Sequence, residues 1–212
     1  RPGPGYHLPF TPQPTALSVL QAADKPRVAI LRDEGSNSDR EMAAAFYSAG
    51  FEPWDITMTD LLAGRVRLDG FRGLAAVGGF SYADVPESAK GWASTIVFND
   101  ALHREFQSFY QRPDTFTFGS CNGCQLFALL GWVPWQGLDA EAQPRFVRNV
   151  SGRFESRWST VRVQKSPAIM LRGMDGLIFG IHVDHGEGRL VFPDALVRER
   201  VRVEGLAPLV YV

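Results

Sequence analysis

The residues with the clearest chemical potential lie in FGSCNGCQLFALL, residues 118–130. Gly119 and Gly123 stand two positions on either side of Cys121, and the spacing G-x-C-x-G is typical of a nucleophile elbow between a strand and a helix. The positive end of that helix should favour the reactive thiolate. The backbone N–H of Asn122, at the same helix start, can point at a developing oxyanion. We therefore predict that Cys121 is a nucleophile.

The pair formed by Cys121 and Cys124 is also compatible with different chemistry. A C-x-x-C pair can be a redox dithiol or half of a zinc site, but there is no second such pair, and His103 and His182 are not spaced as zinc ligands. The sequence thus predicts no metal site. Unpaired cysteines are also often buried small residues, which we expect for Cys124, one turn further into an apolar helix.

Alternating strands and helices must position these residues. From Arg27 onward, short apolar runs alternate with amphipathic stretches, as in strands joined by crossover helices. The pattern predicts strands over 27–31, 51–57, 73–77 and 115–119, and helices over 100–110 and 124–130. Extended segments follow Gly131, at 146–150, 154–163, 177–183 and 188–192. We predict an α/β fold: a mostly parallel sheet flanked by helices, with extra antiparallel strands.

A further helix is expected after the first strand. Ser38 and Glu41 have the spacing of a capping box, and Gly50 should end the helix. The apolar residues expected on one face are Met42, Ala45, Phe46 and Ala49.

Composition limits the class of protein. The 212 residues are 45% hydrophobic and 21% charged, which is typical of a folded globular chain, and the net charge of −1 gives no general field for nucleic acid or a membrane. No apolar run is long enough to span a membrane, and the first residues are rich in proline instead of forming a signal core. We expect a proline-rich linker arm over 1–24, one domain over 25–212, and a cytoplasmic location.

Longer segments carry a resemblance to a known family. SCNGCQ resembles the G-[VI]-C-N-G-C-Q elbow in the class I glutamine amidotransferase domain of phosphoribosylformylglycinamidine synthases. The resemblance covers most of residues 27–212. It includes RVAILRDEGSNSDREMAAAFYSAGFEPWDITMTDLLAG, FRGLAAVGGFSYADV, RFVRNVSGRFESRW and HGEGR.

The resemblance implies an activity. Cys121 would attack the side-chain amide of glutamine, form a γ-glutamyl thioester and release ammonia. In the family, ammonia passes to a synthetase domain of the same long polypeptide, where ATP and Mg²⁺ support conversion of formylglycinamide ribonucleotide to formylglycinamidine ribonucleotide in de novo purine biosynthesis. This chain contains no phosphate-binding glycine motif, so no cofactor is expected here.

The resemblance also implies roles for several more residues. Gly79 and Phe80, in VGGFSYAD, look like the second half of an oxyanion hole, although a glycine pair is also an ordinary turn former. Gln125 lies one helical turn beyond Cys121 and would contact the substrate; the alternative is an exposed glutamine without a role.

The family completes its catalytic relay with a His-x-Glu pair in a Pro-His-Pro-Glu-Arg segment, which this chain does not contain before Val212. His185 and Glu187 form another such pair, and would share a face of an extended strand. The resemblance favours a supporting or substrate-positioning role for them. We expect the isolated chain to hydrolyse glutamine slowly or not at all. The alternative is a catalytically inactive amidotransferase-like binding domain.

A basic stretch from Pro144 to Arg172 is not explained by this activity. Its single acidic residue, Glu155, stands among seven basic ones. The stretch can dock an acidic partner domain, bind a phosphate-bearing substrate, or form a solvated strand face. The seven basic residues are Arg145, Arg148, Arg153, Arg157, Arg162, Lys165 and Arg172.

Overall fold

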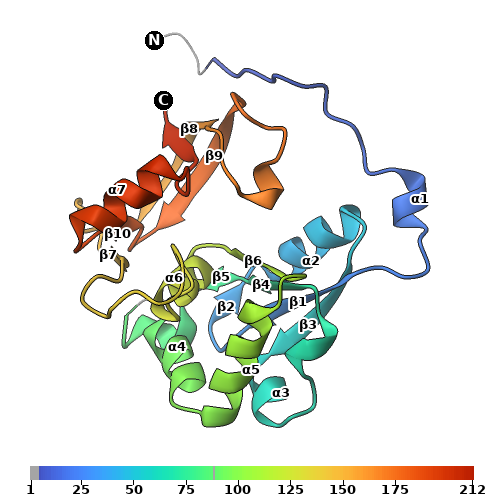
Figure 1. Cartoon of the computed structure of the whole chain (residues 1–212), viewed down its shortest axis with the longest axis vertical. Coiled ribbons are helices and arrows are strands. Elements are labelled where there is room, and N and C mark those ends of the chain that lie inside the picture. Colours follow the sequence, from blue (N-terminus) through green and yellow to red (C-terminus); the bar gives the residue numbers. More distant parts are fainter. Residues whose placement is uncertain (1–4, 88) are drawn as a thin grey trace. The chain divides into compact units, whose positions relative to one another are not determined.

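The computed structural model describes residues 5–87 and 89–212 (Figure 1). The chain packs as two compact units. Residues 14–133 form what we call the α/β unit, and residues 1–13 together with 134–212 form the C-terminal unit. The predicted change of texture after Gly131 falls close to this boundary.

A four-stranded parallel sheet is the centre of the α/β unit, with the strand order β3-β1-β4-β6. The central strands are buried along almost their whole length because helices cover both faces, the usual environment of a parallel sheet. The strands are β1 (Arg27–Arg32), β3 (Glu52–Thr57), β4 (Gly73–Ala76) and β6 (Phe116–Gly119).

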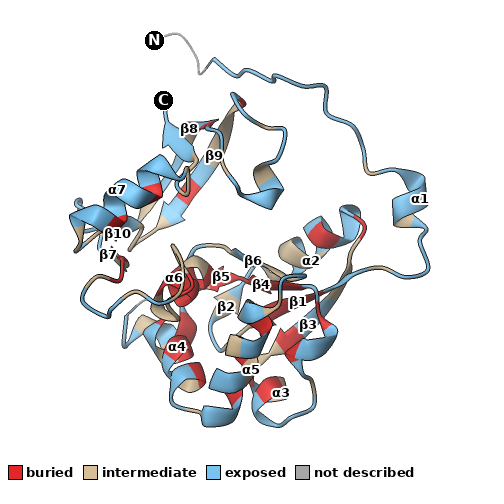
Figure 2. Ribbon diagram, viewed as in Figure 1, coloured by how far each residue is buried: buried red, intermediate tan, exposed pale blue. Residues whose placement is uncertain are grey.

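Side chains that alternate along the strands enter two separate apolar clusters. Val28 and Ile30 of β1 face α2 (Asp39–Ser48), whose Phe46 completes that cluster. Ala29 and Leu31 belong to the larger cluster on the other face, which Figure 2 shows as the red surfaces of the surrounding helices. Those helices are α3 (Met58–Leu62), α4 (Lys90–Val97), α5 (Asp100–Gln111) and α6 (Asn122–Leu129).

Short elements complete the α/β unit. At the carboxyl ends of β1 and β4, the two-residue strands β2 (Ser36–Asn37) and β5 (Gly78–Gly79) pair antiparallel. The remaining elements are α1 (Leu17–Leu20) and the 3-10 helices η1 (Leu68–Gly70) and η2 (Ser81–Asp84).

The C-terminal unit contains an antiparallel sheet of order β11-β8-β9 and a separate pair of strands, β7 and β10. Asp194 caps the helix α7 by accepting hydrogen bonds from two backbone N–H groups. The elements are β7 (Arg145–Val147), β8 (Glu155–Val163), η3 (Ile169–Leu171), β9 (Ile178–His185), β10 (Arg189–Val191), α7 (Ala195–Val203) and β11 (Leu209–Tyr211).

The segment expected as an arm makes specific contacts in both units. His7 exchanges two backbone hydrogen bonds with Ile178 of β9. Further along, Thr15 Oγ1 donates to the carbonyl of Ser48, 2.8 Å away. The first prolines of the arm, Pro2 and Pro4, lie outside the described residues. The domain boundary expected near residue 24 stays a prediction.

The expected fold class is confirmed, but the start of α2 is not built as predicted. Ser38 adopts a left-handed backbone (φ 65°) and its side chain does not cap the helix; its hydroxyl donates to Asn37 Oδ1 instead. The apolar face is also different, because Ala45 and Ala49 are exposed. Gly50 does follow the end of the helix, at φ 93°.

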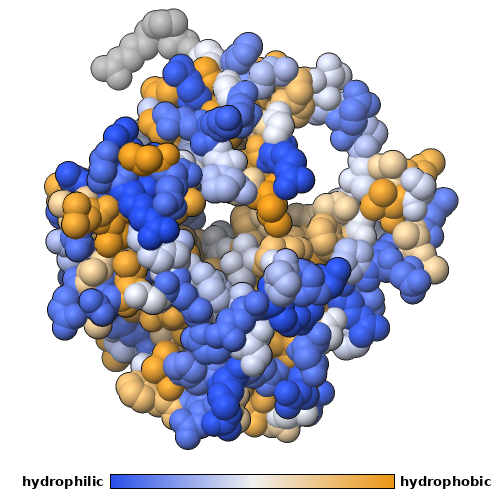
Figure 3. Space-filling view, in the orientation of Figure 1, coloured by the Kyte–Doolittle hydropathy of each residue, from blue (hydrophilic) through white to orange (hydrophobic). Residues whose placement is uncertain are grey.

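Exposed hydrophobic side chains are scattered among polar ones on the face seen in Figure 3. Within the part of the chain that the structure describes, no helix combines the length and apolarity needed to cross a membrane.

Candidate active site

Cys121 occupies the turn between β6 and α6 and is exposed. Its backbone lies at φ 49° and ψ −111°, a conformation that side-chain-bearing residues rarely adopt. Strain of this kind persists where the surrounding structure enforces it and is concentrated at functional sites. The turn therefore has the geometry of a nucleophile elbow.

Glycine is required on both sides of this turn. A Cβ atom on Gly119 would lie 2.8 Å from the backbone nitrogen of Cys124. A Cβ atom on Gly123 would lie 2.1 Å from the carbonyl oxygen of Ala76. Both contacts are with main chain, which cannot move aside as a flexible side chain can. The predicted reason for the G-x-C-x-G spacing is confirmed at the level of packing.

The loops that follow β1 and β4 reach the same edge as Cys121, because parallel strands present their carboxyl ends together. A Cβ atom built on Gly78 would be 3.4 Å from Cys121 Cβ and 3.9 Å from Asn37 Oδ1. The exposed Asn37 carboxamide oxygen is therefore within about 7 Å of Cys121 Cβ. Sequence reasoning missed Asn37, although its position just after the first strand placed it at this edge.

The backbone N–H groups of Gly79 and Phe80 differ in whether the β2–β5 connection already occupies them. Phe80 N–H donates to the carbonyl of Gly35 at 2.9 Å, within the β2–β5 connection. In this register the pair Ser36 and Gly79 is the non-hydrogen-bonded one, so Gly79 N–H points away from β2. Of the two amides expected for an oxyanion hole, Gly79 is therefore the better placed.

The two polar residues of α6 next to the cysteine are buried. Asn122 is 1% exposed, and its Nδ2 has no hydrogen-bond partner among the described residues. Gln125 is 8% exposed, and its backbone N–H donates to the carbonyl of Cys121 at 3.1 Å. The alternative of an exposed Gln125 is wrong.

Cys124 differs from Cys121 in its environment. Neither cysteine forms a disulfide among the described residues, and Cys124 is partly buried. Burial, together with the neighbouring Cys121, raises the pKa of Cys124 to about 11. It remains a thiol at neutral pH, as a residue that packs within the helix should.

The segment after Gly79 continues the edge in a strained conformation. Tyr82, Ala83 and Asp84 are all left-handed, with φ between 52° and 59°. The Tyr82 hydroxyl lies 3.2 Å from Thr95 Oγ1. In the loop after β1, burial raises the pKa of the Asp33 carboxyl.

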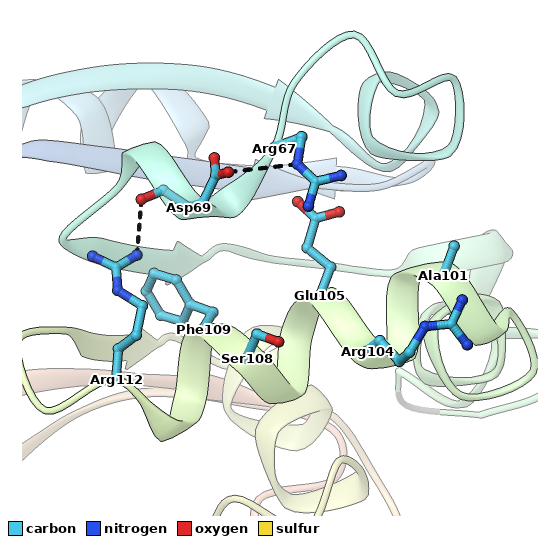
Figure 4. Close-up of a pocket in the computed structure, with 8 residues that line it drawn as sticks. All are labelled: Arg67, Asp69, Ala101, Arg104, Glu105, Ser108, Phe109 and Arg112. Atoms are coloured by element: carbon cyan, nitrogen blue, oxygen red, sulfur yellow. Dashed lines mark hydrogen bonds and ion pairs between the residues drawn. The ribbon is translucent and has the colours of Figure 1, made fainter.

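A cavity of about 260 Å³ lies elsewhere in the α/β unit, between η1 and α5 (Figure 4). Its polar groups hold these two elements together. Arg112 Nη1 donates to the carbonyl of Asp69 at 2.9 Å, and Glu105 accepts the N–H of Leu68. The ion pair between Arg67 Nε and Asp69 Oδ2, 3.5 Å apart, lies within the η1 segment. We assign the cavity a structural role. Across residues 5–87 and 89–212, no three acidic, histidine or cysteine residues are grouped as metal ligands.

His185 and Glu187 lie in the C-terminal unit. His185 is the last residue of β9, whereas Glu187 follows in a bend. The expectation that they share one face of an extended strand is wrong, because the chain turns at Gly186. Asn149 Oδ1 lies 3.0 Å from His185 Nδ1 and fixes the imidazole ring.

Comparisons with known proteins agree with this fold. Residues 25–212 match the model of the CobB/CobQ-like glutamine amidotransferase domain, and the chain belongs to that family. Among its relatives, the probable chloroplastic/mitochondrial phosphoribosylformylglycinamidine synthase of Arabidopsis thaliana is 56% identical over 98% of this chain and 15% of that protein. The phosphoribosylformylglycinamidine synthase of Homo sapiens is 50% identical over 99% of this chain and 16% of that protein.

A solved structure, PurLQS from Thermotoga maritima, matches with a TM-score of 0.66 and 25% identity, over 81% of this chain and 72% of that chain. This chain spans about 15% of the length of the curated relatives it matches.

Proposed function

We propose that this chain is the glutaminase part of a phosphoribosylformylglycinamidine synthase. The observation that carries the proposal is Cys121, exposed on a strained turn between a parallel strand and a helix. The relatives' shared name supports the pathway, and the family supports the substrate, glutamine.

The site supports a two-step hydrolysis. The Cys121 thiolate attacks the carboxamide carbon of glutamine, and the backbone amides of Gly79 and Asn122 stabilise the oxyanion that forms. The C–N bond then breaks, the nitrogen takes a proton and leaves as ammonia, and a γ-glutamyl thioester remains. Water attacks the thioester, which releases glutamate and returns the cysteine.

Two side chains are proposed to orient the substrate. Asn37 Oδ1, the atom that lies towards Gly78, accepts a hydrogen bond from the Ser38 hydroxyl at 3.1 Å and has a second lone pair that can accept an N–H of glutamine. Gln125, buried one turn beyond the cysteine, is proposed to contact the substrate from the helix side.

The wider context is also proposed. Ammonia would pass to the synthetase domain of the same polypeptide, which uses ATP and Mg²⁺ and forms formylglycinamidine ribonucleotide; this chain itself needs no cofactor. For His185 and Glu187 we propose a supporting role. The cytoplasmic location stays a prediction, since the plant relative's name specifies chloroplasts or mitochondria.

Labelling with 6-diazo-5-oxo-norleucine, a glutamine analogue that alkylates nucleophilic cysteines, tests the proposal. Mass spectrometry of the 212-residue chain should show one adduct, on Cys121, and excess glutamine should slow its formation. The variant Cys121→Ser should give none. Cys124→Ser should label as the parent chain does, because a thiol with a pKa of about 11 is about 0.1% ionised at pH 8.

Iodoacetamide provides the control, because it alkylates accessible thiols without requiring a glutamine site. If iodoacetamide modified Cys121 but the glutamine analogue did not, the chain would be a binding domain that has lost its substrate site. Modification of Cys124 in preference to Cys121 would contradict the assignment of the nucleophile.

A further inference from the structure

The C-terminal unit contains a cavity of about 610 Å³, and of the residues that line it only His185 has a role in the proposed glutaminase activity. It unites two sequence features, since the basic stretch supplies Arg157 and the HGEGR segment supplies His185 and Arg189. Arg157 and Ser159 project from the same face of β8, where alternate residues share a side. Tyr211 of β11 reaches the same cavity.

One residue, Asn149, holds the wall of this cavity in a fixed shape. Its Nδ2 donates to the carbonyls of His185 and Arg153, at 2.8 Å and 2.9 Å, and its Oδ1 accepts the N–H of Gly188 at 3.2 Å. The turn is also tight: a Cβ atom on Gly188 would lie 2.2 Å from the ring of His185. The cavity is therefore organised without any ligand.

The charge in the cavity is positive. Glu155 is the acidic group that lines it, and the Ser151 hydroxyl, followed by nearby cationic groups, lowers the pKa of this carboxyl. Glu155 lies 3.7 Å from Arg157 Nε, which makes a loose, exposed pair. Arg189 adds a second guanidinium to the lining. The lining thus contains two arginines against one glutamate, and that glutamate already interacts with Ser151 and Arg157.

From this arrangement we infer that the cavity binds a phosphate dianion, carried by a small sugar monoester or free in solution. Guanidinium groups bind phosphate through paired, charge-assisted hydrogen bonds, and the Ser159 and Tyr211 hydroxyls are further donors. The volume falls in the range of small-molecule sites and exceeds that of a bare phosphate, which favours the monoester. The inference rests on Arg157 and Arg189, which have no role in the proposed glutamine chemistry, so it does not depend on that chemistry.

Isothermal titration calorimetry of the 212-residue chain tests the inference with three probes: ribose 5-phosphate, inorganic phosphate and ribose. Ribose 5-phosphate should bind most tightly, phosphate more weakly, and ribose not measurably. Arg189→Gln should weaken ribose 5-phosphate at least about tenfold, because it removes a charged donor. Arg162→Gln is the matched control, since Arg162 is also a β8 arginine but is not among the residues that line the cavity, and the same charge is lost.

Circular dichroism establishes that each variant is folded, and Arg189→Lys keeps the charge if the glutamine variant is not. A folded lysine variant that binds ribose 5-phosphate more weakly than the parent chain would support the site, because lysine lacks the paired donors of a guanidinium, and unchanged binding would contradict it. The inference is overturned if neither phosphate probe binds, or if Arg162→Gln and Arg189→Gln weaken binding equally. It is also overturned if a glutamate-rich peptide binds and the phosphates do not, since the cavity would then be a docking surface for protein.

Discussion

At the level of single residues, the turn at Cys121 depends on positions where the backbone leaves no room for a side chain, so that only glycine fits. The G-x-C-x-G spacing could be predicted because the need for glycine is local to one turn. The sequence places Asn37 only at the same sheet edge as Cys121, 84 positions away; its distance from the cysteine depends on the pairing of β2 with β5, which the sequence does not indicate.

Replacing Gly123 with alanine tests this account. Gly123→Ala should lower the free energy of unfolding by about 1–3 kcal/mol, because its methyl group would overlap the carbonyl oxygen of Ala76. Urea denaturation of the 212-residue chain measures the change. Gly70→Ala is the control, since nothing lies within 4 Å of its Cβ position, and it should change stability by less than about 0.5 kcal/mol. Equal losses would mean that packing at Gly123 is not tight.

At the level of elements, the strands were largely predicted and several helices were not. The predicted strands over residues 27–31 and 73–77 contain the unbroken apolar runs VAIL (28–31) and LAAV (74–77). Such runs are typical of parallel strands that are buried on both faces of the sheet. Helix α4 gave no such signal: it contains Gly91 and β-branched residues, and is held by burial of Trp92 and Ile96. The capping box also formed elsewhere than expected, at Thr57 and Asp60 of α3.

That capping box predicts a dependence of stability on pH. Hydrogen bonds from Thr57, followed by one from Arg65, lower the pKa of Asp60 from 3.8 to about 2. The unfolded chain therefore binds the proton more readily, so the stabilisation is present above pH 3.8 and is lost as the pH falls towards 2. Asp60→Asn should cost about 1 kcal/mol at pH 7 and progressively less below about pH 4. Urea denaturation of both chains at pH 7 and pH 3 measures this, and a constant difference would contradict it.

At the level of the whole molecule, the two units differ in the size of the apolar core that stabilises each of them. Both apolar clusters, around Phe46 and around Trp92, consist of residues of the α/β unit. The C-terminal unit buries a smaller set. Its buried hydrophobic residues are Val161, Val163, Leu177, Val183, Val197 and Val201.

The fragment 14–133 should consequently fold without the C-terminal unit. We expect helical far-UV circular dichroism, a cooperative urea transition and a free energy of unfolding of about 5 kcal/mol or more. A gradual, uncooperative loss of signal would show that residues 134–212 are needed for its core. The matching fragment 134–212, with its few buried side chains, is expected to unfold at lower urea.

The wall beside Cys121 is built from main chain, with glycine at positions 35, 78, 79, 119 and 123. Such a wall has little room for gradual evolutionary retuning, because most single substitutions there collide with backbone before they can contact a new substrate. Divergence in what the site accepts should instead come from changes in loop length, or from the few side chains that border the wall, Asn37 first among them.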